Sequence, residues 1–278
     1  MTVSSLSKIT LGTMRLSDKN TSLKDCIGIF DAAIQNGVNS FHVSTEYNSF
    51  ELVALAFKNL GVNADNCKLV VKLASPHFDE TSFSQLNLEA RIDNILDKTG
   101  LEKIQVAQWM WRQSPVDDSA RIQKLLANSE EIKSCFQDIS LKGKVDEFGC
   151  FPYTSDFMKS VNNLGISKVH INYQNFWENE LVNGGIHNYS IALRPFFGGK
   201  VKKLHPNFIK ELNVIENRSV ISHSLNYVLS HPNICSAVVG INTLKQLSTI
   251  IETSDSIKKN INTFNTYQSL LENNPYLR

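Results

Sequence analysis

A tyrosine and a lysine, Tyr47 and Lys72, form the pair of side chains best suited to acid–base chemistry. Each stands at or just after the end of a short run of β-forming residues, so the two side chains can meet at one edge of a sheet. An ammonium group beside a phenol stabilises the phenolate and lowers the pKa of the tyrosine, which makes the tyrosine a proton donor near neutral pH. The alternative is that Lys72 pairs with Glu46 or Glu51 and that Tyr47 only packs.

Histidine, tryptophan and arginine side chains follow the ends of other β-rich runs. His42 lies five residues before Tyr47 and adds an imidazole that can exchange a proton. A substrate pocket with an apolar or sugar-stacking wall is expected to be lined by Trp111, Arg112, Phe151 and His170.

An alternative hypothesis is a metal site, in which His42, His77 and His170 converge as imidazole ligands. No acidic residue accompanies them at a recognisable spacing, and the chain has no His-Glu-x-x-His motif. We therefore expect hydrogen-bonded histidines and no metal.

Two glycine-containing segments are suited to binding a phosphate group. In the sequence PFFGGK at 195–200, paired glycines let backbone N–H groups approach an anion closely. The sequence GINT at 240–243 leads into a helix start, whose free N–H groups and dipole also favour an anion. The residues expected to hold a phosphate-bearing cofactor are Arg194, Gly198, Gly199, Lys200, Gly240, Asn242 and Thr243.

Short β-rich runs alternate with longer amphipathic runs along almost the whole chain. The expected strands cover 9–14, 40–45, 68–74, 103–111, 144–151, 168–174, 190–196 and 234–241. The expected helices cover 22–36, 50–59, 88–98, 119–141, 154–163, 219–230 and 243–253, with a polar helix at the C-terminal end.

This alternation predicts an α/β fold, a (β/α)₈ TIM barrel formed by residues 1–278 as one domain. An open, doubly wound sheet is the competing architecture. It is disfavoured because no expected strand is followed by a G-x-G-x-x-G sequence that opens a helix. A barrel places its active site at the C-terminal ends of its strands, where the candidate residues lie.

The overall composition narrows the class of partner. The chain has 28 basic and 27 acidic residues, so the molecule as a whole has no positive electrostatic field that would attract nucleic acid or an anionic membrane. No charged N-terminal region precedes an apolar run, and no apolar stretch approaches the about 18 residues that span a bilayer. The five cysteines form no C-x-x-C pair, which indicates reduced thiols in the cytoplasm. We expect a small-molecule substrate, and a protein partner stays open.

Several motifs resemble those of the aldo-keto reductases over nearly the whole chain. They are ITLGTMRL at 9–16, AAIQNGVNSFHVSTEYNSFE at 32–51, VVKLA at 70–74, GKVDEFG at 143–149 and the segment 224–240. The resemblance implies NADP(H) as cofactor, with NAD(H) as the alternative. It also matches Tyr47 and Lys72 to the tyrosine and lysine of the family's catalytic tetrad.

Other positions of the resemblance have changed. The tetrad aspartate is replaced by His42, and the tetrad histidine falls on Met110. The Ser-Asn pair that would hold the nicotinamide amide is replaced by Phe151 and Pro152, and the glutamine of the sixth strand by His170. The stacking aromatic after the seventh strand falls on Leu193, with Arg194 next.

These replacements have chemical consequences. Without the aspartate, Lys72 is expected to lack a buried counter-ion. The loss of one preorganised polar donor commonly reduces the rate by about 10²–10³. Ordinary reductase activity is therefore expected to be weak.

The function predicted from these features is an NAD(P)(H)-linked oxidoreductase acting on a carbonyl or alcohol of a sugar-like or small organic substrate. One alternative is a catalytically degenerate aldo-keto-reductase-like barrel that binds a ligand or a protein partner. Another is a non-redox isomerase or lyase in which Lys72 and the histidines transfer protons.

Overall fold

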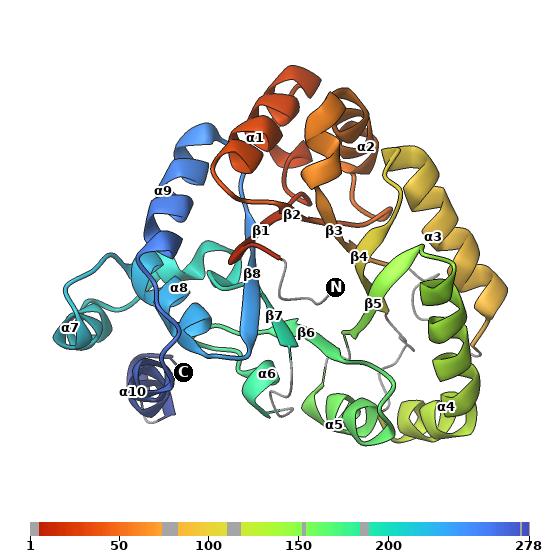
Figure 1. Ribbon diagram of the computed structural model, residues 1–278. Coiled ribbons are helices and arrows are strands. Elements are labelled where there is room, and N and C mark those ends of the chain that lie inside the picture. Colours follow the sequence, from red (N-terminus) through yellow and green to blue (C-terminus); the bar gives the residue numbers. More distant parts are fainter. Residues whose placement is uncertain are drawn as a thin grey trace.

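The computed structural model describes residues 6–73, 83–109, 118–151, 154–183, 189–272 and 274–277. Eight parallel strands pair in sequence order and close into a barrel, because β8 also pairs with β1 (Figure 1). The strands are β1 (Ile9–Gly12), β2 (Ser40–Val43), β3 (Lys68–Lys72), β4 (Ile104–Trp109), β5 (Val145–Cys150), β6 (Val169–Tyr173), β7 (Tyr189–Leu193) and β8 (Ile234–Gly240). The predicted (β/α)₈ barrel is confirmed.

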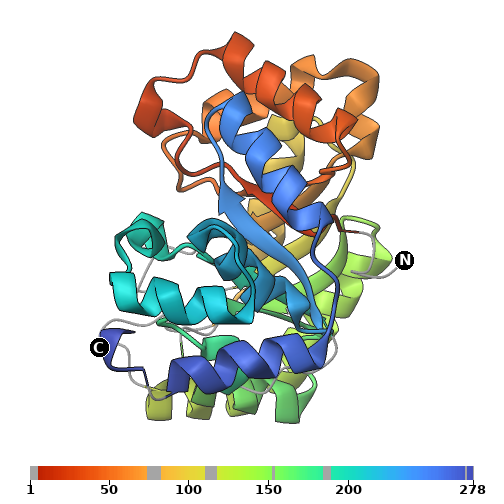
Figure 2. The same ribbon diagram turned by 90° about the vertical axis from the view of Figure 1, so that its left-hand side faces the viewer.

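Helices surround the barrel on the outside (Figure 1). They are α1 (Leu23–Gln35), α2 (Phe50–Asn59), α3 (Gln85–Thr99), α4 (Asp118–Leu141), α5 (Ser155–Leu164), α6 (Glu180–Asn183), α7 (Pro206–Ile215), α8 (Val220–Ser230), α9 (Leu244–Asp255) and α10 (Ile261–Glu272). Both α7 and α10 pack against α8, which Figure 2 shows from the side. No described helix is both long and apolar enough to cross a membrane.

The helix ends follow local sequence signals. Ser22, Thr154 and Thr243 each precede a helix and accept a hydrogen bond from a backbone N–H of its first turn. Gly100 and Gly165 end α3 and α5 with φ of 71° and 66°, a left-handed conformation that costs glycine little. These signals explain why the predicted helices lie within a few residues of the observed ones.

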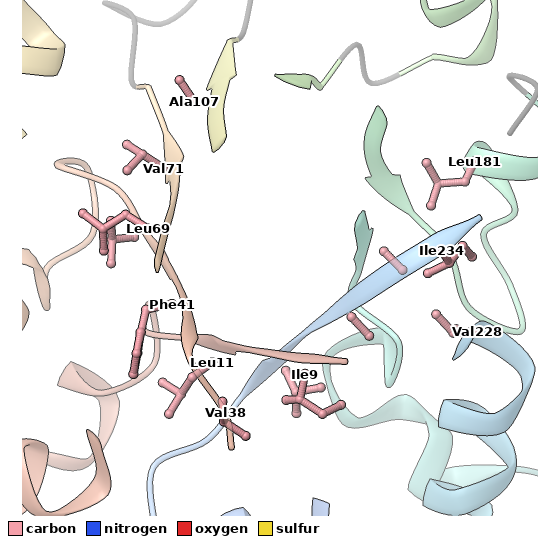
Figure 3. Close-up of a cluster of buried hydrophobic side chains, with 14 of the residues drawn as sticks. Ile9, Leu11, Val38, Phe41, Leu69, Val71, Ala107, Leu181, Val228 and Ile234 are labelled. Carbon is pink, nitrogen blue, oxygen red and sulfur yellow. The ribbon is translucent and has the colours of Figure 1, made fainter. Parts of the chain in front are cut away.

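Side chains alternate between the two faces of the barrel wall. The larger apolar cluster lies between strands and helices and includes Ile9, Leu11, Phe41, Leu69 and Val71 (Figure 3). A second cluster fills the barrel interior and is formed by Leu6, Val70, Val106, Phe151, Val169, Ile171, Ile191 and Leu193. Because alternate residues of a strand point to opposite faces, membership of a cluster shows which way each neighbouring side chain points.

Two expectations about the C-terminal half are corrected. The seventh strand was expected to continue to residue 196, but β7 ends at Leu193. Arg194 has φ of 55°, outside the β region, and Pro195 has no N–H to donate to a neighbouring strand. The structure also contains two helices that were not expected, α6 between β6 and β7 and α7 between β7 and β8.

Candidate active site

Three polar side chains, those of His42, Lys72 and Gln108, point into the barrel at its C-terminal end. Phe41 and Val71 face the helices, so the alternating His42 and Lys72 face the interior. Lys72 pairs in register with Gln108 of β4. The three polar residues therefore occupy neighbouring strands β2, β3 and β4.

Tyr47 reaches this group from the loop after β2. Its N–H donates to the carbonyl of Ser44 at 3.1 Å, and its own carbonyl accepts from the N–H of Phe50, the first residue of α2, at 2.8 Å. These two turns hold the tyrosine over the end of β2. The hydroxyl of Tyr47 lies 3.3 Å from Nδ1 of His42, within hydrogen-bond distance.

His42 is held on both ring nitrogens. Its Nε2 lies 2.9 Å from Oε1 of Gln108, while Nδ1 faces Tyr47. Burial lowers the pKa of His42 from its ordinary 6.5 to about 4. Burial is the largest cause of this shift; the hydrogen bond to Gln108 opposes it, and the Lys72 ammonium contributes to it. The imidazole is therefore neutral at physiological pH.

Lys72 has a counter-ion after all. Its Nζ lies 2.7 Å from Oε2 of Glu46, and both side chains are more than four-fifths buried. The expectation that Lys72 lacks a carboxylate partner is wrong, because Glu46 occupies that role from the residue directly before Tyr47. Glu51, the other candidate, pairs with Lys98 on the surface.

The ion pair does not exclude the lysine–tyrosine contact. The Nζ of Lys72 lies 5.9 Å from the centroid of the Tyr47 ring. The expected convergence of Tyr47 and Lys72 at the barrel mouth is therefore observed, together with the predicted alternative, pairing of Lys72 with Glu46.

The opposite half of the mouth is apolar. Phe151 and Leu193 belong to the interior cluster, and Phe151 packs edge-to-face against Tyr173 with ring centroids 5.2 Å apart. The mouth thus has a polar side on β2–β4 and an apolar side on β5–β7. This division of polar and apolar side chains suits a small organic molecule with one oxygen turned toward the polar side.

A stack of rings and cations extends this apolar side outward. The guanidinium of Arg194 lies 4.9 Å from the ring centroid of Tyr173 and 4.8 Å from that of Phe197. Trp177 stacks on Phe197 with centroids 5.1 Å apart, and Nζ of Lys200 lies 5.0 Å from each of these two rings. Cation–π contacts of this kind hold both cations beside the mouth.

The two glycines after β7 form a tight turn. Gly198 and Gly199 have φ of 64° and 93°, and a Cβ added at either would meet nothing within 4 Å. The open side of the turn allows a ligand to approach the backbone. The N–H of Gly199, however, donates to the carbonyl of Phe196 at 2.9 Å, so this group is already used within the turn.

The segment after β8 leads into α9 as expected. Thr243 caps the helix by accepting from the N–H of Gln246, and the Gln246 side chain accepts from the N–H of Asn242 at 3.0 Å. Gly240 lies beside Arg15, whose Cδ would be 3.8 Å from a Cβ added there. Arg15 is exposed, and its guanidinium is paired with the carboxylate of Asp18 at 2.9 Å. A helix N-terminus, an exposed guanidinium and an open glycine turn fit the phosphates of a dinucleotide.

Some sequence-predicted residues are not brought to this site. His170 alternates with Val169 and Ile171, which face the interior, so it points toward the helices and not into the mouth. The structure therefore does not bring His170 to the mouth, where its substrate contact was expected. Met110, Trp111, Arg112 and His77 lie outside the described residues.

Among the residues that the structure describes, no group of three His, Cys, Asp or Glu side chains could hold a metal ion.

Gln108 and Arg15 are site residues that the sequence analysis missed. Gln108 could be noticed in the sequence because it is one of only two polar residues, with Gln105, in the run IQVAQW, and in the structure it is 1% exposed. A buried amide must find hydrogen-bond partners, which should have directed attention to a polar neighbour on the same face.

Comparison with known proteins identifies the family. The model of the aldo/keto reductase family matches residues 8–193. No curated protein sequence matches the chain. An aldo-keto reductase from Bacillus halodurans in its holo form superposes with a TM-score of 0.72 at 14% identity, covering 98% of this chain and 96% of the other.

Two further solved structures have the same fold. An aldo-keto reductase from Klebsiella pneumoniae in complex with NADPH gives a TM-score of 0.71 at 13% identity, covering 98% of this chain and 94% of the other. One from Brucella melitensis gives 0.66 at 14% identity, covering 95% and 94%. The family match extends from β1 to the end of β7, more than half of the sequence, and on this ground the chain belongs to the aldo/keto reductase family.

Proposed function

We propose that this chain is an NAD(P)(H)-linked oxidoreductase that interconverts a carbonyl and an alcohol, with Tyr47 exchanging a proton with the substrate oxygen. The observation that carries the proposal is the position of the Tyr47 hydroxyl at the polar side of the mouth, beside His42 and Lys72. A hydroxyl held next to an imidazole and an ammonium group is suited to general acid–base catalysis.

Each neighbour of Tyr47 has a distinct role in this proposal. The ammonium of Lys72 stabilises negative charge that develops on the phenol oxygen. Glu46 holds that ammonium in place and balances its charge at 2.7 Å. The neutral His42 offers a second proton-exchanging group behind the tyrosine.

A nicotinamide cofactor, when bound, supplies or accepts the hydride. NADP(H) is favoured over NAD(H) because the NADPH-bound Klebsiella reductase has the same fold and cations lie next to the expected phosphate loops. The residues proposed to hold the cofactor are Arg15, Arg194, Gly198, Gly199, Lys200, Gly240, Asn242 and Thr243. Since the Gly199 N–H is used in its own turn, cationic side chains are expected to contribute more than the sequence suggested.

The substrate is proposed to be a small or sugar-like organic molecule. Phe151, Tyr173 and Leu193 form the apolar wall against which its carbon skeleton would pack. Trp111 and Arg112 are kept as proposed substrate contacts. The five free cysteines support a reducing, cytoplasmic location as part of the same proposal.

The test combines cofactor binding with turnover. NADPH and NADH are titrated by calorimetry into the wild type and into Tyr47→Phe, and turnover is followed over a panel of aldehydes and alcohols. We expect both proteins to bind NADPH equally and the variant to lose about 10²-fold or more in turnover. Tyr189→Phe, an exposed change at the opposite end of the barrel, is the matched control and should keep full activity.

Two results would contradict the proposal. The absence of cofactor binding at millimolar concentration would favour a degenerate barrel that binds another ligand or a protein partner. Equal turnover in the wild type and in Tyr47→Phe would show that another residue exchanges the proton.

A further inference from the structure

We propose that Gln108 is a positioning residue that fixes the tautomer of His42, and that His42 receives the proton of Tyr47 when an alcohol is oxidised. This inference rests on the proposed function. It assigns the direction of proton movement through Tyr47, His42 and Gln108, which the oxidoreductase proposal leaves open.

The direction follows from what each atom can donate. The carbonyl oxygen Oε1 of Gln108 only accepts, so the Nε2 atom of His42, 2.9 Å away, carries the hydrogen. A neutral imidazole has one N–H, which leaves Nδ1 as an acceptor. The hydroxyl of Tyr47, 3.3 Å from Nδ1, therefore donates to His42. Its oxygen is left with lone pairs that can accept the hydroxyl of an alcohol.

The surroundings of His42 keep it neutral. The residue is 5% exposed, and the charged group that acts on it is the ammonium of Lys72 on β3, which is itself paired with the carboxylate of Glu46. From β4 it faces the uncharged amide of Gln108, and from the loop after β2 the phenol of Tyr47. Burial and the nearby ammonium lower the pKa of His42 to about 4, so the Nδ1 lone pair is available throughout the neutral range.

The proton transfers balance as follows. The O–H bond of the alcohol breaks and its proton forms a bond to the oxygen of Tyr47, while the original Tyr47 proton moves to Nδ1 of His42. The electron pair of the carbinol C–H bond leaves with its hydrogen as hydride to the oxidised nicotinamide of the proposed function. The imidazolium then has a proton on each nitrogen and loses one to water, because a second positive charge beside Lys72 is unfavourable.

Carbonyl reduction, the reverse reaction, requires a different protonation state of His42. To return a proton to Tyr47 during carbonyl reduction, His42 must first be an imidazolium, a form that becomes common only as the pH approaches about 4. At neutral pH the relay therefore supports oxidation of an alcohol, and its support for reduction should increase as the pH falls.

The chain offers closely matched variants of the positioning residue. Gln108→Leu keeps a similar volume but removes the acceptor, so Nε2–H loses its partner and the other tautomer becomes accessible. Gln108→Glu places a carboxylate against Nε2, which stabilises the imidazolium. Gln105→Leu removes a second buried glutamine from the same strand, one that bonds Asp146 and not His42, and serves as the control.

The first readout is the tautomer itself, measured by ¹⁵N NMR of imidazole-labelled protein without cofactor or substrate, with His42→Gln to assign the signal. We expect the wild type and Gln105→Leu to show hydrogen on Nε2 only, Gln108→Leu to show a mixture, and Gln108→Glu to show an imidazolium near pH 7. Hydrogen on Nδ1 in the wild type, or an unchanged spectrum in both Gln108 variants, would overturn the proposal. Far-UV circular dichroism checks that each variant folds, and the glutamate variant tests the idea independently if the leucine variant does not fold.

The second readout is the pH profile of alcohol oxidation. Gln108→Leu should lower kcat by roughly 10-fold to 100-fold with unchanged cofactor affinity. Gln108→Glu should shift the acidic limb of the profile to higher pH. Profiles that match the wild type in both variants would overturn the relay. If the wild type shows the expected tautomer but no turnover with any alcohol, the proposed function and the proton transfer both fail, whereas Gln108 still positions His42.

Discussion

Glu46 and Lys72 form an ion pair with 2.7 Å between Oε2 and Nζ, and the carboxylate comes from the residue that directly precedes Tyr47. The position that the family resemblance matches to the tetrad aspartate holds His42, which contacts Gln108 and Tyr47. The lysine therefore keeps a carboxylate partner although the aspartate is absent. This arrangement separates the electrostatic partner of Lys72 from the hydrogen-bond partner of Tyr47.

Glu46→Gln should destabilise the protein by about 1–3 kcal/mol, because the change leaves a largely buried ammonium without its carboxylate. Urea denaturation at pH 7 measures the change in the free energy of unfolding. Glu51→Gln is the matched control, since its carboxylate is 70% exposed and its pair with Lys98 should contribute between about 0 and 1 kcal/mol. Equal decreases in the free energy of unfolding in the two variants would show that the buried Glu46–Lys72 pair stabilises the protein no more than the exposed pair does.

The burial of His42 predicts a loss of stability on acidification. Its pKa is about 4 in the folded chain and ordinarily 6.5, so between these values the unfolded chain binds a proton that the folded chain does not. The free energy of unfolding should therefore fall as the pH decreases from about 6.5 to about 4, by about 3 kcal/mol for this group. Urea denaturation at pH 7 and at pH 4.5 measures the difference.

His42→Gln should reduce this acid sensitivity. Part of the slope should remain, because burial also lowers the pKa of His223 and of His231. His205→Asn replaces an exposed histidine at the start of α7 by another good helix cap and should leave the slope unchanged. A slope that is the same in His42→Gln and in the wild type would refute neutral burial of His42.

Replacing Lys200, Lys202 and Lys203 together by alanine should weaken NADPH binding by about 10-fold at low salt. All three are exposed around the glycine turn after β7, where the phosphates are proposed to bind. The difference from the wild type should shrink as the salt concentration increases, because salt screens exposed charges. Calorimetric titration at two ionic strengths measures both effects.

The control for that experiment replaces three exposed lysines elsewhere, Lys142, Lys210 and Lys258, by alanine. It changes the net charge equally and should leave NADPH affinity within about 2-fold of the wild type. Similar losses in the two triple variants would indicate a general charge effect and would remove the proposed phosphate site.

The tight packing around Gly149 on β5 predicts that adding a methyl group there destabilises the protein, and that a second substitution relieves the destabilisation. A Cβ added there would lie 2.7 Å from Cδ1 of Ile171 and 3.3 Å from Cγ1 of Val106, both inside the barrel. Gly149→Ala should therefore cost about 1–3 kcal/mol through overpacking. Ile171→Val removes the closest atom, so the double variant should be more stable than the sum of the two single changes predicts. Additive losses, measured by thermal and urea unfolding, would show that this contact does not cause the destabilisation.

Local patterns along the chain predict the order and kind of most helices and strands. The expected helix at 50–59 coincides with α2, and each of the eight expected strands overlaps an observed one. Alternating apolar runs, serine and threonine caps and terminal glycines are local signals, so they can be read before the chain is folded. Tyr47 and Lys72 could be chosen for the same reason, since both stand at strand ends in a fold whose active site must lie there.

Which side chains meet at the site depends on the folded arrangement of the strands and loops. A shift of one residue along a strand reverses the face of a side chain, so the sequence position of His170 at a strand end does not show that its side chain faces the helices. The position of Lys72 opposite Gln108 depends on the register of β3 and β4. The ion pair of Glu46 with Lys72 depends on the path of the loop after β2. The first pair joins residues 36 positions apart and the second joins residues 26 positions apart, through packing that no local pattern encodes.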